Sequence, residues 1–330
     1  MNKIWLGILL LPLILCEGCN RRQYRQIEGK IYGTYYRIVY ESDRDMGGEL
    51  LKEINGVNSS LSMFDTSSVL SRINRNVSDE MDTLTARVIT TAYEVFRQTG
   101  GAFDMTVAPL VNAWGFGYKN DRLPSKEKID SLLLLTGMDK LSVNGNRLIK
   151  KDPAMEIDAG AIAKGLGVDV AADFLEATHT LNYMVDIGGE VRVKGNSAKQ
   201  RPWRIGIDKP MDNLAPEGPR EIQLILSLSE GAMATSGNYR NFYVHDGKKY
   251  AHTIDPRTGY PVQRDILSAT VYASSCMLAD AYATSFMVLG FDESRKVVEK
   301  TPELQACLIY EEEGEIKVWM TDYFKTFVLE

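Results

Sequence analysis

Hydrophobic residues recur along this chain with two periods, one typical of helices and one typical of strands. The clearest helical period covers residues 83–99, where apolar side chains fall on one face and Gly100-Gly101 ends the segment. Helical spacing also runs over residues 49–61, 68–74, 126–137 and 277–290, and over the later part of 157–175 after a glycine turn.

Strands are predicted where β-branched and aromatic residues cluster between turn signals. These runs cover residues 30–40, 183–194, 203–207, 222–228, 242–244, 249–254 and 266–273. Hairpin turns are expected at Asn144-Gly145 and at His245-Asp246-Gly247. Strands and helices do not alternate in regular βα units, so the pattern favours an α+β fold over a doubly wound sheet.

Composition narrows the class of protein without defining it. The chain has 330 residues, 44% hydrophobic and 25% charged, which suits a globular protein with a real core and fits either two domains or one large one. A net charge of −6 disfavours a broad surface that tracks phosphates, so no nucleic-acid partner is predicted.

The first residues predict a targeting segment. Lys3 precedes an apolar run over residues 4–15 that is too short to span a bilayer, and Gly18-Cys19 ends it. This resembles a bacterial lipoprotein signal in which Cys19 is acylated; Cys16 fits less well because Leu15 precedes it. The alternative is a plain cleaved secretion signal, and both place the mature chain outside the cytoplasm.

This reading divides the chain into residues 1–18 as signal peptide, 19–28 as tether and 29–330 as folded domain, anchored to a membrane on its periplasmic side. Only Cys276 and Cys307 then remain as thiols. They are predicted either to pair in the oxidising compartment or to stay free and buried.

Candidate chemistry appears first near the predicted helix at 277–290. Asp280 and Thr284 are four residues apart, so a helix places both on one face, and small alanines around them leave room for a ligand. A carboxylate and a hydroxyl are hard oxygen donors that suit Mg²⁺. The alternative is an acidic residue near a helix start and a Thr that bonds back to the helix.

Other candidates carry weaker signals. His252 ends a predicted strand and could act as a general base near neutral pH, although a structural role is the alternative. Lys164 follows a glycine turn at a predicted helix start, where free N–H groups favour anions, but GAIAKG has neither P-loop nor dinucleotide spacing. Asp104 is predicted either to bind a ligand or to cap a helix.

Six motifs occur in the order and rough spacing of one family. They read GGAFDMTVAPLVNAWGFG, IDAGAIAKGLGVDV, VDIGGEVRVKG, ATSGNYRNFY, HTIDPRTGYPV and ADAYATSFMVLG. Over about residues 30–290 and beyond, the chain resembles the ApbE family, the FAD:protein FMN transferases. The resemblance implies a compact α+β unit whose two lobes bracket a flavin cleft, rather than two independent domains.

The resemblance also implies an activity. Family members depend on Mg²⁺, are often lipoproteins, and move FMN from FAD onto a Thr or Ser hydroxyl of a target protein with release of AMP. The target would be a subunit of a redox-driven membrane complex or another extracytoplasmic flavoprotein. Two alternatives stay open, namely a Mg²⁺-dependent FAD pyrophosphatase giving FMN and AMP, and a flavin-binding lipoprotein without catalysis.

Matched motif by motif, the resemblance assigns roles to individual residues. Asp280, Thr284 and the carbonyl of Ala161 resemble metal ligands, and His252 resembles the catalytic base. The FAD contacts it implies are Ala102, Phe103, Asp104, Asp158, Lys164, Thr253 and Ile254. Tyr32 and Phe64 stand where Met and Tyr are expected; stacking on the flavin or adenine survives both changes, whereas a phenol hydrogen bond at Phe64 would be lost.

Overall fold

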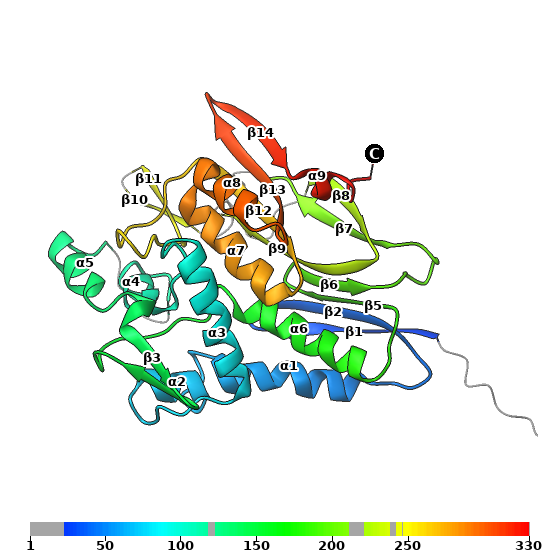
Figure 1. Ribbon diagram of the computed structural model, residues 1–330, viewed down its shortest axis with the longest axis horizontal. Coiled ribbons are helices and arrows are strands. Elements are labelled where there is room, and N and C mark those ends of the chain that lie inside the picture. The colour runs from blue at the N-terminus through cyan, green and yellow to red at the C-terminus, as the bar shows by residue number, and fades with distance from the viewer. Residues whose placement is uncertain (1–22, 118–122, 211–220, 238–241, 246, 330) are drawn as a thin grey trace, which may run out of the picture.

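The computed structural model describes residues 23–117, 123–210, 221–237, 242–245 and 247–329. Its centre is an antiparallel sheet in which neighbouring strands follow the order β1-β2-β5-β6-β9-β12-β13-β14 (Figure 1). These strands are β1 Gln23–Ile31, β2 Thr34–Ser42, β5 Tyr183–Ile187, β6 Glu190–Lys194, β9 Glu230–Gly237, β12 Ile266–Ala273, β13 Gln305–Glu312 and β14 Glu315–Met320.

Three short hairpins lie outside this sheet. They are β3 Leu141–Asn144 with β4 Arg147–Lys150, β7 Trp203–Asp208 with β8 Ile222–Leu228, and β10 Phe242–His245 with β11 Lys248–Ala251. The helices are α1 Gly47–Leu61, α2 Val69–Asn74, α3 Thr83–Gln98, α4 Ala108–Ala113, α5 Lys126–Leu133, α6 Ala163–Ala177, α7 Cys276–Leu289, α8 Phe291–Lys300 and α9 Asp322–Lys325, with 3₁₀ turns at η1 Met105–Val107 and η2 Met138–Lys140.

Both faces of the central sheet are covered, and the side-chain period of two explains how. On β9, Ala232 and Ala234 pack among the helices, whereas Met233 between them joins the cluster formed with β7, β8 and α9. In the same way, Leu308 on β13 faces the helices and Cys307 faces the opposite cluster. Figure 1 shows α1, α6 and α7 on one side of the sheet and the β7–β8 hairpin on the other.

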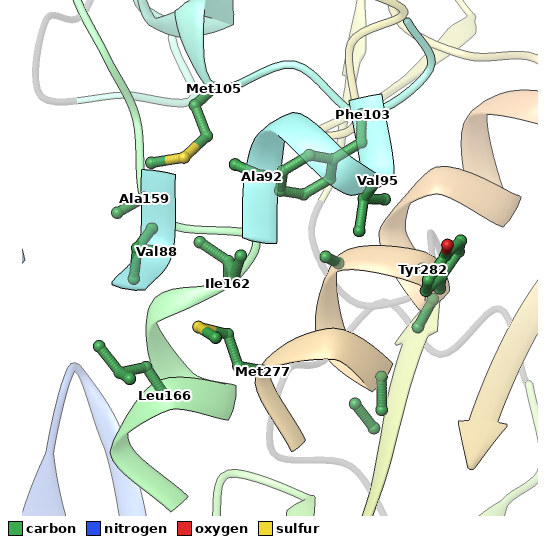
Figure 2. Close-up of a cluster of buried hydrophobic side chains, with 14 of the residues drawn as sticks. Val88, Ala92, Val95, Phe103, Met105, Ala159, Ile162, Leu166, Met277 and Tyr282 are labelled. Atoms are coloured by element: carbon green, nitrogen blue, oxygen red, sulfur yellow. The ribbon is translucent and has the colours of Figure 1, made fainter. Parts of the chain in front are cut away.

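The largest core lies where α3, α6 and α7 meet. Figure 2 shows side chains from these helices together with Phe103, Met105 and Ala159 from the intervening loops, all of them buried. The loops that border the site are therefore anchored by the same core that packs the helices, and this fixes their positions relative to α7.

The predicted α+β class is confirmed, and most predicted elements are present. The helix predicted over 83–99 is α3, capped by Asp82, and the strand predicted over 266–273 coincides with β12. Cys276 and Cys307 are both buried free thiols, so the second of the two cysteine alternatives holds. No helix in the described part of the chain is both long and apolar enough to cross a membrane.

Two predictions near the N-terminus are wrong. The tether over residues 19–28 is contradicted from Gln23 onward, because Gln23–Ile31 forms strand β1. The single strand predicted over 30–40 is a hairpin that turns at Tyr32 and Gly33, which have φ of 51° and 74°. The other proposed boundaries, including the signal peptide over residues 1–18, fall outside the described residues.

Candidate active site

Two adjoining cavities open beside the N-terminal end of α6 and share Gly160 in their walls. The first has a volume of about 420 Å³ and is lined by residues from 102–107, 158–161, 235–237, 252–256 and α7. The second has a volume of about 450 Å³ and lies between the β1–β2 turn, the end of α1 and the loop before α6. Together they form a two-part cleft of a size suited to a dinucleotide.

Helix α7 carries the two predicted metal ligands into the first cavity. Ser275 caps the helix, and Asp280 and Thr284 lie one turn apart on its cavity-facing side. Asp280 Oδ2 accepts the N–H of Gly165 at 3.0 Å, and the Thr284 hydroxyl lies 3.2 Å from that of Ser236.

The donor set fits a hard divalent cation. Ala161 lines the same cavity as Asp280 and Thr284, so one cavity is bordered by residues that carry a carboxylate, a hydroxyl and a backbone carbonyl. Among the described residues, no three or more His, Cys, Asp and Glu side chains are grouped so that they could hold a metal ion. The chemistry of these donors therefore suits Mg²⁺, which completes its shell with water and phosphate oxygens, rather than a zinc site.

Lys164 does not extend freely into the cleft. It forms an ion pair with the buried Glu190 at the start of β6, although it also lines the second cavity. Burial alone would lower the pKa of Lys164, but the Asp280 and Glu190 carboxylates outweigh it and raise that pKa. Burial raises the pKa of Glu190, with Asp280 adding to the shift and Lys164 opposing it.

Asp104 fulfils the structural alternative and also borders the first cavity. Its Oδ1 accepts the N–H and hydroxyl of Thr106 at 2.8 and 2.5 Å, which caps the 3₁₀ turn η1, and its Oδ2 accepts the N–H of Met138 at 3.1 Å. Burial raises the pKa of Asp104, and these hydrogen bonds oppose the shift. With three donors already bound, Asp104 chiefly shapes the cavity wall.

Asp158 differs from Asp104 in its bonding. Its Oδ1 accepts the N–H of Gly160 at 2.6 Å, and the residue lines the first cavity. Burial raises the pKa of Asp158, and the Gly160 bond opposes that shift. Ala102 and Phe103 are buried and line the same cavity, so its wall combines apolar surface with acidic groups.

His252 lies in the first residue position after β11 and lines the same cavity as Asp280. The edge of its ring meets Phe116, with ring centroids 6.5 Å apart. The chain then continues through buried Thr253 and Ile254 into a turn whose Gly259 carbonyl accepts the indole N–H of Trp114 at 2.8 Å. This turn fixes the backbone that presents His252.

Tyr32 and Phe64 border the second cavity, as does Lys164. The Tyr32 hydroxyl donates to the carbonyl of Ile54, and burial raises its pKa. Its ring lies so close to α6 that a Cβ added at Gly167 would come within 2.5 Å of it. Phe64 is 77% exposed, so it presents an aromatic face at the mouth of the cavity.

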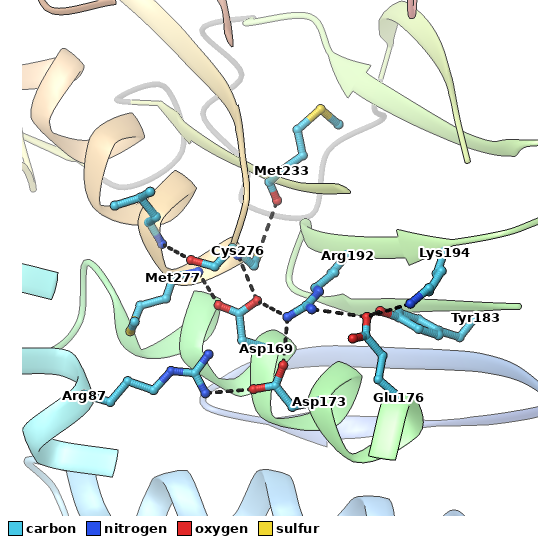
Figure 3. Close-up of polar contacts among 12 residues, drawn as sticks. Arg87, Asp169, Asp173, Glu176, Tyr183, Arg192, Lys194, Met233, Cys276 and Met277 are labelled. Carbon is cyan, nitrogen blue, oxygen red and sulfur yellow. Dashed lines mark hydrogen bonds and ion pairs between the residues drawn. The ribbon is translucent and has the colours of Figure 1, made fainter. Parts of the chain in front are cut away.

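A buried polar network holds α6, β6 and α7 together behind the site (Figure 3). Asp169 of α6 accepts the backbone N–H groups of Cys276 and Met277 at 2.9 and 2.8 Å, which satisfies the start of α7. Its Oδ1 also binds Arg192 of β6 at 3.1 Å, and Arg192 continues to Asp173 and Glu176. The elements carrying Lys164, Glu190 and Asp280 thus share one anchor.

The predicted residues fall into two groups in space. The first cavity gathers Ala102, Phe103, Asp104, Asp158, Ala161, His252, Thr253, Ile254, Asp280 and Thr284, and the second gathers Tyr32, Phe64 and Lys164. Cys19 lies outside the described residues. Sequence analysis assigned no role to Glu190 or to the wall formed by Thr235, Ser236 and Gly237, although that wall lies within the ATSGNYRNFY motif.

The fold and cleft define a class, namely an α+β protein with a two-part pocket that is lined by oxygen donors and by Lys164. The model of the ApbE family matches residues 32–308. The chain belongs to the ApbE family.

Several relatives are similar over nearly their whole length. The FAD:protein FMN transferase of Vibrio cholerae is 37% identical, with 98% of each chain covered, and that of Escherichia coli is 32% identical, with 97% of this chain and 96% of the relative covered. Among solved structures, the flavin transferase ApbE of Vibrio cholerae superposes with a TM-score of 0.82 at 37% identity, covering 93% of this chain and 100% of that one. The ApbE protein of Thermotoga maritima gives a TM-score of 0.80 at 33% identity, with 93% and 100% covered.

Proposed function

We propose that this protein transfers FMN from FAD to a hydroxyl group of a target protein, with release of AMP. The observation that carries this proposal is the shared cavity of His252 and Asp280 in a chain that is 37% identical, from end to end, to an FAD:protein FMN transferase. A base and a cation site beside one two-part cleft supply what phosphoryl transfer requires, which is positioning and charge stabilisation.

The proposed metal is Mg²⁺, held by Asp280, Thr284 and the Ala161 carbonyl. When bound, such an ion offsets the charge of the pyrophosphate and of the leaving phosphate. The N-terminal end of α6 adds positive potential beside Gly160, whereas the charge of Lys164 there is balanced by Glu190. The two ring systems of FAD would then occupy the two cavities, with the pyrophosphate near Gly160.

His252 is proposed as the general base. It would take the proton from a Thr or Ser hydroxyl of the target, whose oxygen then attacks the phosphorus on the flavin side. The bond from that phosphorus to the bridging oxygen breaks, and AMP leaves with the electron pair of the broken bond. The product is FMN joined to the target by a phosphoester bond.

Intact mass spectrometry tests this function. The full-length protein is incubated with FAD, Mg²⁺ and a flavin-accepting protein, and the acceptor is expected to gain the mass of one FMN while AMP is released. Free FMN and AMP without a modified acceptor would instead identify an FAD pyrophosphatase. Binding of FAD without any AMP would identify a non-catalytic flavin-binding protein and contradict both enzymatic functions.

We also propose that Cys19 is lipidated and anchors the protein to a membrane on its extracytoplasmic side. The support is the signal-like run over residues 4–15 followed by Gly18-Cys19. Growth with an alkyne-tagged fatty acid should label the wild-type protein, and Cys19→Ala should abolish the label and move the protein to the soluble fraction. An unlabelled wild-type protein would leave the plain secretion signal as the better interpretation.

A further inference from the structure

A buried ion pair adjoins the proposed metal ligand. The Lys164 ammonium pairs with Glu190 Oε1, and the side chains are 31% and 4% exposed. The next backbone N–H along α6, that of Gly165, donates to Asp280 Oδ2 at 3.0 Å. Consecutive residues at the start of α6 are therefore bound to two different carboxylates, and the Asp280 carboxylate also raises the pKa of Lys164, so both carboxylates act on the ammonium.

Stability alone does not account for Glu190. Its Oε2 is buried and has no hydrogen-bond partner among the described residues. A buried ion pair stabilises a fold little, because the cost of removing both charges from water offsets their attraction, and an unpaired buried oxygen adds to that cost. A contribution to stability therefore does not explain why a negatively charged residue lies beside Lys164, and we look for a functional explanation.

We propose that Glu190 is a positioning residue that neutralises Lys164 and so keeps the Asp280 carboxylate available to a divalent cation. This inference rests on the metal role of Asp280 in the proposed function. Without the charge of Glu190, Lys164 becomes an uncompensated cation near Asp280, and it repels a metal ion while attracting the metal's carboxylate ligand. Glu190 thus sets the affinity of the cation site without contacting the cation.

The effect of Glu190 on cation affinity can be measured by titrating the full-length protein with Mn²⁺ in the absence of FAD. The electron paramagnetic resonance signal of free Mn²⁺ decreases as the ion binds. Glu190→Gln keeps the shape of the side chain and an oxygen that accepts from Lys164, but it removes the charge. The dissociation constant for Mn²⁺ is expected to rise about tenfold, which corresponds to about 1.4 kcal/mol. Glu190→Asp, which keeps the charge, should recover most of the affinity.

A charge-balanced variant separates this role from a merely structural one. Lys164→Gln combined with Glu190→Gln removes both charges, so the Mn²⁺ affinity is expected to return to within about threefold of the wild-type value. If Glu190→Gln fails to fold, Lys164→Gln alone provides the test, because removing the competing cation should leave Mn²⁺ binding as tight as in the wild type or tighter.

Any of three results from the variants would overturn the inference: wild-type Mn²⁺ affinity in Glu190→Gln, a doubly substituted protein that binds as weakly as Glu190→Gln, or weakened binding in Lys164→Gln. Asp280→Ala provides the control for location and should abolish the binding. A wild-type protein that binds no Mn²⁺ would also overturn the inference. In that case the FMN-transfer assay still tests the proposed function, so the two failures are distinguishable.

Discussion

His252 and Asp280 reach the same cavity from different elements, one from the segment after β11 and the other from the middle of α7. Taken singly, each has an ordinary structural explanation, since a His after a strand and an Asp on a helix are common. Their convergence, together with Thr284 and Ala161, distinguishes them from such residues. Asp104 shows the opposite case, because its carboxylate is fully engaged by Thr106 and Met138.

Replacing His252 by Ala should slow FMN transfer by at least about 100-fold, because a general base contributes that much or more to proton transfer. FAD binding should stay within a few-fold of the wild-type value. The initial rate of acceptor flavinylation measures the first effect, and equilibrium titration with FAD measures the second.

His179→Asn is a matched control for this substitution. His179 is exposed after α6 with φ of 58°, a left-handed backbone conformation that Asn tolerates, and it borders neither cavity. Its transfer rate should equal that of the wild type. A His252→Ala protein that transfers FMN at full rate would show that another group takes the proton.

Among the elements, the contact between α6 and α7 determines the site most directly. Helix α6 begins beside Lys164, α7 carries Asp280, and Gly165 lets the two backbones approach closely. A Cβ added at Gly165 would lie 2.5 Å from the carbonyl oxygen of Cys276 and 2.6 Å from the Cα of Met277. Backbone atoms cannot rotate away as a side chain can, so this contact allows only glycine.

Gly165→Ala should therefore lower the free energy of unfolding by about 1 to 3 kcal/mol, as overpacked sites do. It should also weaken Mg²⁺ activation by shifting Asp280. Gly56→Ala is the control, because Gly56 lies inside α1 with nothing within 4 Å of its added Cβ. That change should raise stability by about 0.5 to 1 kcal/mol. Urea unfolding measures both, and equal effects of the two changes would contradict the close approach.

Asp169 makes the second connection between these helices. Asp169→Asn removes a buried charge that receives two backbone N–H groups and Arg192, and it should lower the free energy of unfolding by about 2 kcal/mol. Asp173→Asn removes a carboxylate that also binds Arg192 but is 44% exposed, so its effect should stay below about 1 kcal/mol. If Asp173→Asn lowered the free energy of unfolding more than Asp169→Asn does, the contacts of Asp169 with α7 would not be the main stabilising contacts of this network.

At the scale of the whole molecule, short sequence patterns predicted which segments form helices and strands better than they predicted which of these elements lie next to each other. Residues 266–273 contain Ile, Thr, Val and Tyr, which favour strands, two serines follow them, and Gly290 ends α7, so both elements could be predicted from short stretches. Strand β1 was missed because Gln23–Ile31 is a polar edge strand, mostly exposed and paired on one side only, without the alternation that indicates a half-buried strand.

The candidate site shows the same division. His252, Asp280 and Thr284 belong to local motifs, and recognition of those motifs assigned their roles. Glu190 became visible only when sheet order placed the start of β6 beside α6, because no spacing in the sequence relates it to Lys164, which lies 26 positions earlier. The wall formed by Thr235, Ser236 and Gly237 likewise depends on β9 running next to β12 beneath α7.

If Cys19 is lipidated as proposed, the early start of β1 limits how far from a membrane the enzyme can work. Strand β1 begins at Gln23, and 23 − 19 = 4 residue steps separate it from Cys19. Four steps span at most about 14 Å even when fully extended. A lipid on Cys19 would therefore hold the folded body against the bilayer surface, and the cleft would meet only those acceptors whose hydroxyl lies within one molecular diameter of the lipid.

This restricted reach predicts a preference that is measurable in proteoliposomes. An acceptor anchored in the same vesicles should be flavinylated faster than its soluble form at equal bulk concentration, because confinement raises the local concentration of both partners. A flexible insert of about 20 Gly and Ser residues before Gln23, with an average span of about 25 Å, should reduce the preference. Equal rates for both acceptors would show that the short connection does not confine the reaction. With the native connection, a protein anchored through Cys19 would modify only those acceptor hydroxyls that lie close to the bilayer surface.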